Sequence, residues 1–210
     1  MEMMRSAALA ASLLIAGALL RGGLAAQEAA PANLRGEILS VSADGLTLGV
    51  RAAQGDERIL RLKPSAAIIA VIPATHADIK PGLFIGAAAL PGPDGALHAL
   101  EVHIFPEALR GTAEGSRAYD LAPQSTMTNG AISAMVNGVT GPKLTVMYKG
   151  GEQTILIDET TPVVAFVPGV PGDLRKDASV TARGVTKAAD GAYDVTRFVV
   201  VGRDGLKLPM

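Results

Sequence analysis

Two stretches of the chain repeat the same order of apolar and turn residues at a spacing of about 95 positions. Glu57–Pro73 reads ERILRLKPSAAIIAVIP, and Glu152–Pro168 reads EQTILIDETTPVVAFVP, so that their apolar positions coincide. Upstream of them, Gly36–Ile38 corresponds in the same way to Gly130–Ile132. Self-similarity of this kind indicates one structural unit used twice. It restricts the chain to folds that two copies of a small unit can build.

Each of the two units, residues 36–111 and 129–205, is predicted to form a small β domain. Apolar residues alternate with others along Leu46–Val50, which is the period of a half-buried strand. Thr75–Asp78 resembles a single capped helical turn. Several short strands and one helical turn suit a small, partly open barrel of the OB or SH3-like kind. We therefore predict an all-β chain with two tandem barrels, which pack on one another or exchange an edge strand because so small a unit buries little core.

The segment between the units, residues 112–128, is predicted to be a linker that carries function. It has little apolar periodicity and is too long for a simple hairpin, and long connections are usually functional or disordered. Tyr119 and Leu121 alternate around Asp120, so an extended chain would bury the two apolar side chains and expose the carboxylate.

Residues 1–26 have the features of a secretory signal peptide. Arg5 supplies a positive charge, Ala7–Leu20 is an apolar run, and Gly23 and Ala25 fit a small-x-small cleavage site. The run is shorter than the ~20 residues of a membrane-spanning helix, which disfavours the alternative of an uncleaved anchor. We expect a mature chain that is periplasmic or secreted and has no membrane span. The predicted ends of this mature chain are a flexible lead at residues 27–35 and a short tail at residues 206–210.

Charge and composition exclude several classes of function. The 19 basic and 20 acidic residues nearly cancel, and aromatic residues make up 3% of the chain. The chain therefore lacks the positive surface and the aromatic platforms that bind nucleic acid. The absence of cysteine excludes disulfides, thiolate metal sites and thiol catalysis. Because no G-x-S-x-G motif, P-loop or dinucleotide fingerprint is present either, we expect neither enzymatic activity nor nucleic-acid binding.

Several motifs resemble those of an uncharacterised family of small exported bacterial proteins. The most specific are ALEVHIFPE at Ala99–Glu107 and STMTN at Ser125–Asn129, and GTAEG at Gly111–Gly115 also fits. The resemblance covers nearly the whole mature chain and implies a repeated small β domain of unknown function and an exported location. Automated labels for such proteins sometimes read "metal ABC transporter permease". The sequence contradicts that label, because a permease needs several membrane spans. The resemblance implies no activity and no catalytic residue.

Glu101 and His103 are the strongest candidates for a site. On the predicted strand Leu97–Phe105 they point to one face, while the apolar residues between them point to the other. A carboxylate and an imidazole on one strand face can share a proton or a metal ion. The corresponding residues of the second unit are predicted to be Arg197 and Val199. The fold therefore does not need the pair.

Asp120 would complete a metal site with Glu101 and His103 if the linker folded back onto the strand. Two ligands alone make no complete metal site. The alternative interpretation is a solvent-facing pair, or a histidine that packs under the linker and is hydrogen-bonded.

The sequence leaves two functions open. The first is an exported, non-enzymatic module that binds an unknown envelope protein or a small ligand, with the barrels as scaffold and the linker as the working surface. The second is a periplasmic metal-binding accessory protein in which Glu101 and His103 hold a divalent metal. No other cofactor is expected.

Overall fold

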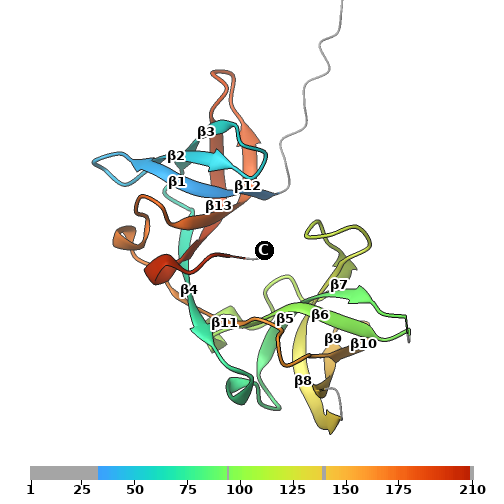
Figure 1. The fold of residues 1–210 in the computed structure, drawn as a ribbon. Helices are drawn as coiled ribbons and strands as arrows, with labels where there is room; N and C mark the ends of the chain where they lie inside the picture. Colours follow the sequence, from blue (N-terminus) through green and yellow to red (C-terminus); the bar gives the residue numbers. More distant parts are fainter. Residues whose placement is uncertain (1–32, 94, 139–140, 209–210) are drawn as a thin grey trace, which may run out of the picture.

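The computed structural model describes residues 33–93, 95–138 and 141–208, which form strands joined by turns and short 3₁₀ helices (Figure 1). The all-β class is therefore confirmed. The predicted signal peptide and residues 27–32 of the predicted lead lie outside the described residues. The strands are β1 (Asn33–Val41), β2 (Thr47–Ala52), β3 (Glu57–Leu62), β4 (Ala67–Ala74), β5 (Phe84–Pro91), β6 (Leu97–Ile104), β7 (Gly115–Ala118), β8 (Thr126–Gly138), β9 (Gly141–Tyr148), β10 (Gly151–Leu156), β11 (Val163–Pro168), β12 (Ser179–Lys187) and β13 (Tyr193–Gly202). The 3₁₀ helices are η1 (His76–Asp78), η2 (Glu107–Leu109), η3 (Pro171–Asp173) and η4 (Arg203–Gly205).

The capped helical turn lies where the sequence predicts it, and glycines occupy two of the hairpin turns. The helical turn η1 begins after Thr75, whose backbone N–H and hydroxyl both donate to the Asp78 carboxylate at 2.8 and 2.7 Å. The turn between β1 and β2 contains Gly45 with a φ of 70°, and the turn between β12 and β13 contains Gly191 with a φ of 86°. Glycine adopts this left-handed conformation without the steric cost of a Cβ.

The first barrel is a closed ring of five strands. β1 pairs with β2 and β12, β2 pairs with β3, and β13 pairs with both β3 and β12. Side chains of alternate residues fill its interior, and Ile38, Leu48, Val50 and Leu60 are fully buried there. The alternation that predicts half-buried strands thus supplies the core of this barrel.

The second barrel is a closed ring of the same kind. β8 pairs with β5 and β9, β10 pairs with β9, and β6 pairs with both β5 and β10. Its fully buried interior includes Ile85, Val102, Leu144 and Ile155. Short β7, from the predicted linker, adds to the outside of β8.

Neither barrel is built from one of the two predicted units. The first barrel takes β1, β2 and β3 from residues 36–111 and their lead, but β12 and β13 from residues 129–205. The second barrel reverses this division, and antiparallel β4 and β11 join the two rings (Figure 1). The prediction of one partly open barrel per unit therefore differs from the structure, in which two strands of each unit close the other unit's ring. Closure pairs the edges that a half-barrel would expose to solvent.

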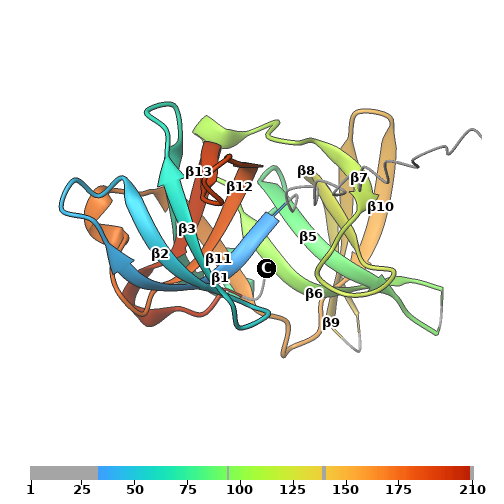
Figure 2. The same ribbon diagram turned by 90° about the horizontal axis from the view of Figure 1, so that it is seen from above.

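A third apolar cluster lies where the barrels meet. It contains Phe84, Phe105 and Phe166, with edge-to-face ring contacts at 5.4 Å between Phe84 and Phe105 and at 4.8 Å between Phe105 and Phe166. Buried Val71 and Val200 extend it across β4 and β13. Both views place the two barrels side by side around this junction (Figure 2). The outer faces of β6 and β13 are therefore covered where the barrels meet.

Three predicted boundaries move. β1 begins at Asn33, inside the predicted lead, because its first residues pair with β12. β8 begins at Thr126, inside the predicted linker, where it pairs with β5 and β7. In the predicted tail, Leu206 and Leu208 pack against the third apolar cluster. Within the described ranges, no helix has both the length and the apolar character needed to cross a membrane.

Candidate functional site

Glu101 and His103 lie on the outer face of β6, as predicted, but they are not in solvent. Val102 between them belongs to the core of the second barrel, whereas Glu101 and His103 are buried on the opposite face of the strand. Glu101 is 0% exposed and His103 is 2% exposed, and the His103 Nε2 contacts the Glu101 Oε1, a contact that is an ion pair when His103 is protonated. The His103 ring lies against Phe166 with a centroid distance of 5.2 Å. The pair is therefore enclosed by protein.

The counterparts of this pair on β13 differ from the predicted ones. Val199 points into the first barrel and belongs to its core, and the residues of β13 that face the junction are Phe198 and Val200. An irregularity in the pairing of β12 with β13, between Arg183 and Val185, shifts the faces by one residue. The second unit therefore has apolar residues where the first has an ion pair.

Asp120 is not brought to Glu101 and His103. Its two carboxylate oxygens accept hydrogen bonds from the Arg35 guanidinium at 2.7 and 3.0 Å, and Asn33 donates to it at 2.9 Å. No group of three or more histidine, aspartate or glutamate residues that could hold a metal ion occurs in residues 33–93, 95–138 and 141–208. The predicted three-ligand site is therefore not assembled, because Arg35 of β1 holds Asp120 in the place where the linker meets the first barrel.

Tyr119 and Asp120 tie the linker to the first barrel, and we call this set of contacts the clasp. The Tyr119 ring lies 5.6 Å from the guanidinium carbons of both Arg35 and Arg183, and its hydroxyl accepts a hydrogen bond from Arg183 at 2.7 Å. Tyr119 and Leu121 are half-buried and Asp120 is exposed, as their alternation predicts. The clasp holds the linker along the junction of the barrels.

We expect Asp120→Asn to weaken the clasp in a pH-dependent way. Hydrogen bonds from Arg35 and from Asn33 lower the pKa of Asp120 from 3.8 to about 2. A carboxyl group with a lowered pKa stabilises the fold above its unfolded pKa, and this stabilisation disappears as the pH falls toward the folded pKa. Because Asp120 is 47% exposed, the free energy of unfolding should fall by about 1 kcal/mol or less at pH 7. Urea unfolding at pH 7, 4 and 2.5 checks this: the difference from the wild type should narrow with the pH, and a constant difference would contradict it.

A cavity of about 180 Å³ lies between the barrels beside His103, and we call it the inter-barrel pocket. Its wall is apolar on both sides, and three arginines line it as well. The lining residues are Ile69, His103, Phe105, Leu109, Thr112, Ala113, Arg117, Met127, Asn129, Phe166, Arg183, Arg197, Phe198 and Val200. They come from both barrels and from the linker, so the pocket exists only in the assembled molecule.

Asn129, which lines this pocket, has a hydrogen-bond acceptor without a partner. Asn129 is 4% exposed, and its Nδ2 donates to the Thr112 backbone oxygen at 3.0 Å. Its Oδ1 is buried without a hydrogen-bond partner. Gly86 on the neighbouring β5 avoids a clash with this oxygen, because a Cβ at position 86 would lie 2.8 Å from Oδ1. A buried acceptor without a partner costs about 1–3 kcal/mol, which a hydrogen-bond donor from a ligand would recover.

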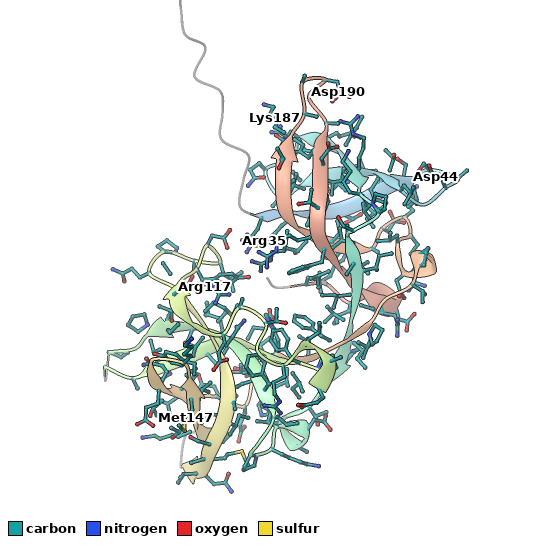
Figure 3. All side chains as sticks on the ribbon, turned by 180° about the vertical axis from the view of Figure 1, so that it is seen from behind. Arg35, Asp44, Arg117, Met147, Lys187 and Asp190 are labelled. Atoms are coloured by element: carbon teal, nitrogen blue, oxygen red, sulfur yellow. The ribbon has the colours of Figure 1, made fainter. Side chains whose placement is uncertain are left out.

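Three arginines that the sequence analysis did not single out converge at the same pocket. Arg117 lies on β7, Arg183 on β12 and Arg197 on β13. Figure 3 shows Arg117 on the side of the second barrel that faces the first, near Arg35. Burial, together with the charge of Arg183, lowers the pKa of Arg117 from its ordinary value. The pocket therefore combines a positive group of side chains with an apolar wall.

A larger hollow of about 530 Å³ at the end of the first barrel is a weaker candidate. Its charged residues already have partners within the chain. Arg35 binds Asp120, and Arg58 contacts Asp56 and donates to the Tyr193 hydroxyl. The inter-barrel pocket is the better candidate because its arginines have no carboxylate partner among the described residues.

Fold and pocket together define a double-barrel β protein with a small amphipathic cavity between its barrels. Comparison of the chain with protein-family models, with curated proteins and with solved structures gives no match.

Proposed function

We propose that this chain is a non-enzymatic binding protein that takes one small organic molecule into the inter-barrel pocket. The observation that carries the proposal is the buried Oδ1 of Asn129, an acceptor without a partner beside an apolar wall. Ligand pockets are typically apolar cavities with a few placed polar groups. The linker contributes Thr112, Ala113 and Arg117 to the lining, in keeping with its predicted role as the working surface.

The pocket supports binding better than catalysis. Its one histidine, His103, uses Nε2 in the contact with Glu101. A general base needs an available nitrogen within reach of the reacting group. We extend the proposal to an exported protein, which rests on the predicted signal peptide alone.

The metal-binding alternative has less support. Glu101 and His103 are two ligands, and a stable zinc site needs at least three from the protein. Both side chains are enclosed, so a metal ion would have to displace their mutual contact.

A thermal-shift screen of small aromatic and aliphatic molecules against residues 27–210 tests the proposal. A ligand at 100 times its Kd stabilises the folded state by about 2.7 kcal/mol, which corresponds to a rise of roughly 5–10 °C in Tm for a chain of this size. Leu109→Trp should abolish the response, because Leu109 lines the pocket from a half-buried position.

The matched control is Leu121→Trp, which makes the same change at a half-buried linker residue that does not line this pocket. This variant should respond like the wild type. A library that stabilises nothing, or hits that bind Leu109→Trp unchanged, would refute binding in the pocket.

A further inference from the structure

Of the ten arginines among the described residues, six pair with a carboxylate and four do not. One of these four, Arg51, is exposed on β2, and the other three gather at one place. Six arginines of the described residues have a carboxylate within ion-pair distance: Arg35, Arg58, Arg61, Arg110, Arg175 and Arg203. Over the same part of the chain, Arg117, Arg183 and Arg197 form no ion pair with a carboxylate, and all three line the inter-barrel pocket. The pocket lining contains no aspartate or glutamate. Asp120, which lines a neighbouring hollow with the same three arginines, is paired with Arg35. Among the described residues, the three positive charges at the pocket therefore have no carboxylate within ion-pair distance.

Neighbours position two of these guanidinium groups by hydrogen bonds that leave the charge unneutralised. Arg183 donates to the Tyr119 hydroxyl, and Arg117 donates to the Ala113 backbone oxygen at 2.9 Å. The Arg197 side chain runs over Gly184, where a Cβ would lie 2.5 Å from the Arg197 Cγ. Arginine favours planar anions because its N–H groups form a fork that fits a carboxylate. An anion here would also relieve the repulsion between Arg117 and Arg183.

The rest of the pocket restricts the body of such an anion. The apolar wall of the pocket includes three phenylalanines, Phe105, Phe166 and Phe198. An inorganic ion would make no apolar contact with this wall. A volume of about 180 Å³ equals that of roughly six water molecules, which limits the ligand to one ring or a short branched chain. A hydrogen-bond donor on that body would satisfy the unpartnered Oδ1 of Asn129.

We propose that the inter-barrel pocket binds a small organic carboxylate whose apolar body carries a hydroxyl or amino donor. The carboxylate lies among Arg117, Arg183 and Arg197, the apolar body packs on the phenylalanine wall, and the donor binds Asn129 Oδ1. This inference rests on the proposed function and names the ligand class of the same site.

Calorimetric titration of residues 27–210 with three single-ring probes tests the ligand class. The probes are 4-hydroxybenzoate, benzoate and phenol. Benzoate lacks the donor and should bind about 5–10-fold more weakly than 4-hydroxybenzoate, the factor that one hydrogen bond is worth. Phenol lacks the charge and should bind at least tenfold more weakly. The affinity of both acids should fall with added NaCl, since exposed charges are screened.

Charge-removing variants assign the head group. Arg183→Gln and Arg197→Gln should each weaken 4-hydroxybenzoate about tenfold and leave phenol unchanged. Arg51→Gln is the matched control, because Arg51 is exposed on β2 and does not line the pocket. It should bind all probes like the wild type.

The outcomes separate the two proposals. If phenol binds as tightly as the acids, and Leu109→Trp abolishes its binding, the carboxylate requirement is wrong and the proposed binding function still holds. Acids that bind Arg183→Gln and Arg197→Gln at full affinity overturn the assigned head-group site. Absence of binding by every probe overturns the ligand class, and a thermal-shift screen without hits overturns the binding function as well.

Discussion

Gly36→Val and Gly130→Val are each expected to lower the free energy of unfolding by about 3 kcal/mol, the upper range for overpacking a closely packed interior. A Cβ at Gly36 would lie 2.2 Å from the Arg51 backbone oxygen, and one at Gly130 would lie 2.3 Å from the Met147 backbone oxygen. Both contacts are with the backbone of the paired strand, so no side chain can move to make room. Urea unfolding followed by far-UV circular dichroism measures the loss.

The interleaved barrels add a second expectation for the same variants. Gly36 belongs to the first barrel and Gly130 to the second, and each barrel contains strands from both units. Either substitution should therefore shift a single cooperative transition of the whole molecule. A urea unfolding curve in which half of the circular dichroism change keeps the wild-type midpoint would contradict the exchange of strands.

Gly172→Ala is the control for this pair. A Cβ at Gly172 meets nothing within 4 Å, and the backbone there does not have a positive φ. Its stability should stay within about 0.5 kcal/mol of the wild type. If Gly130→Val unfolds at the same urea concentration as the wild type, β8 and β9 are farther apart at this position than the structure shows.

His103→Leu is expected to cost about 3 kcal/mol at pH 7, because it leaves the fully enclosed Glu101 without its partner. Removing one member of a buried ion pair typically costs about 3–5 kcal/mol, whereas replacing both by apolar residues is often neutral. The double variant Glu101→Met and His103→Leu should therefore lie within about 1 kcal/mol of the wild type. Apolar Phe198 and Val200 occupy the corresponding positions on β13, which supports tolerance of such a pair.

Denaturation of the wild type, the single variant and the double variant completes this comparison. A double variant that is no more stable than His103→Leu would contradict a buried ion pair. Zinc and copper titration of the same three proteins addresses the metal alternative. If the wild type binds metal stoichiometrically and the double variant does not, the metal-binding function would be favoured over a purely structural role for Glu101 and His103.

The sequence predicts the local features of the fold well because they depend on neighbouring residues. Alternation along Leu46–Val50 and the cap formed by Thr75 and Asp78 are visible in short windows, and both occur in the structure. The pairing of Asn33 with Arg183 joins residues 150 positions apart. No local pattern reports which of two similar units completes a ring. The sequence therefore offers the exchange of one edge strand only as an alternative, and the exchange of two strands in each direction is not predicted.

In the candidate site, too, the sequence predicts the local features and not those that depend on distant residues. The period of a strand places Glu101 and His103 on one face, but their burial depends on the other barrel. Asp120 is misassigned because its partner, Arg35, is 85 positions away. The three pocket arginines come from three strands and form no motif. Arg197 lies within an irregularity in the pairing of β12 with β13, which the period of two does not reveal.

The measurement that tests the account most directly is a titration of ¹⁵N-labelled residues 27–210 with 4-hydroxybenzoate, followed by NMR. We predict chemical-shift changes in the side-chain amide of Asn129, in the Nε–H groups of Arg183 and Arg197, and in the backbone amide of Thr112. Shifts confined to Arg58 and Tyr193, at the hollow of the first barrel, would contradict the inter-barrel pocket as the binding site. A spectrum that the ligand leaves unchanged would contradict it equally.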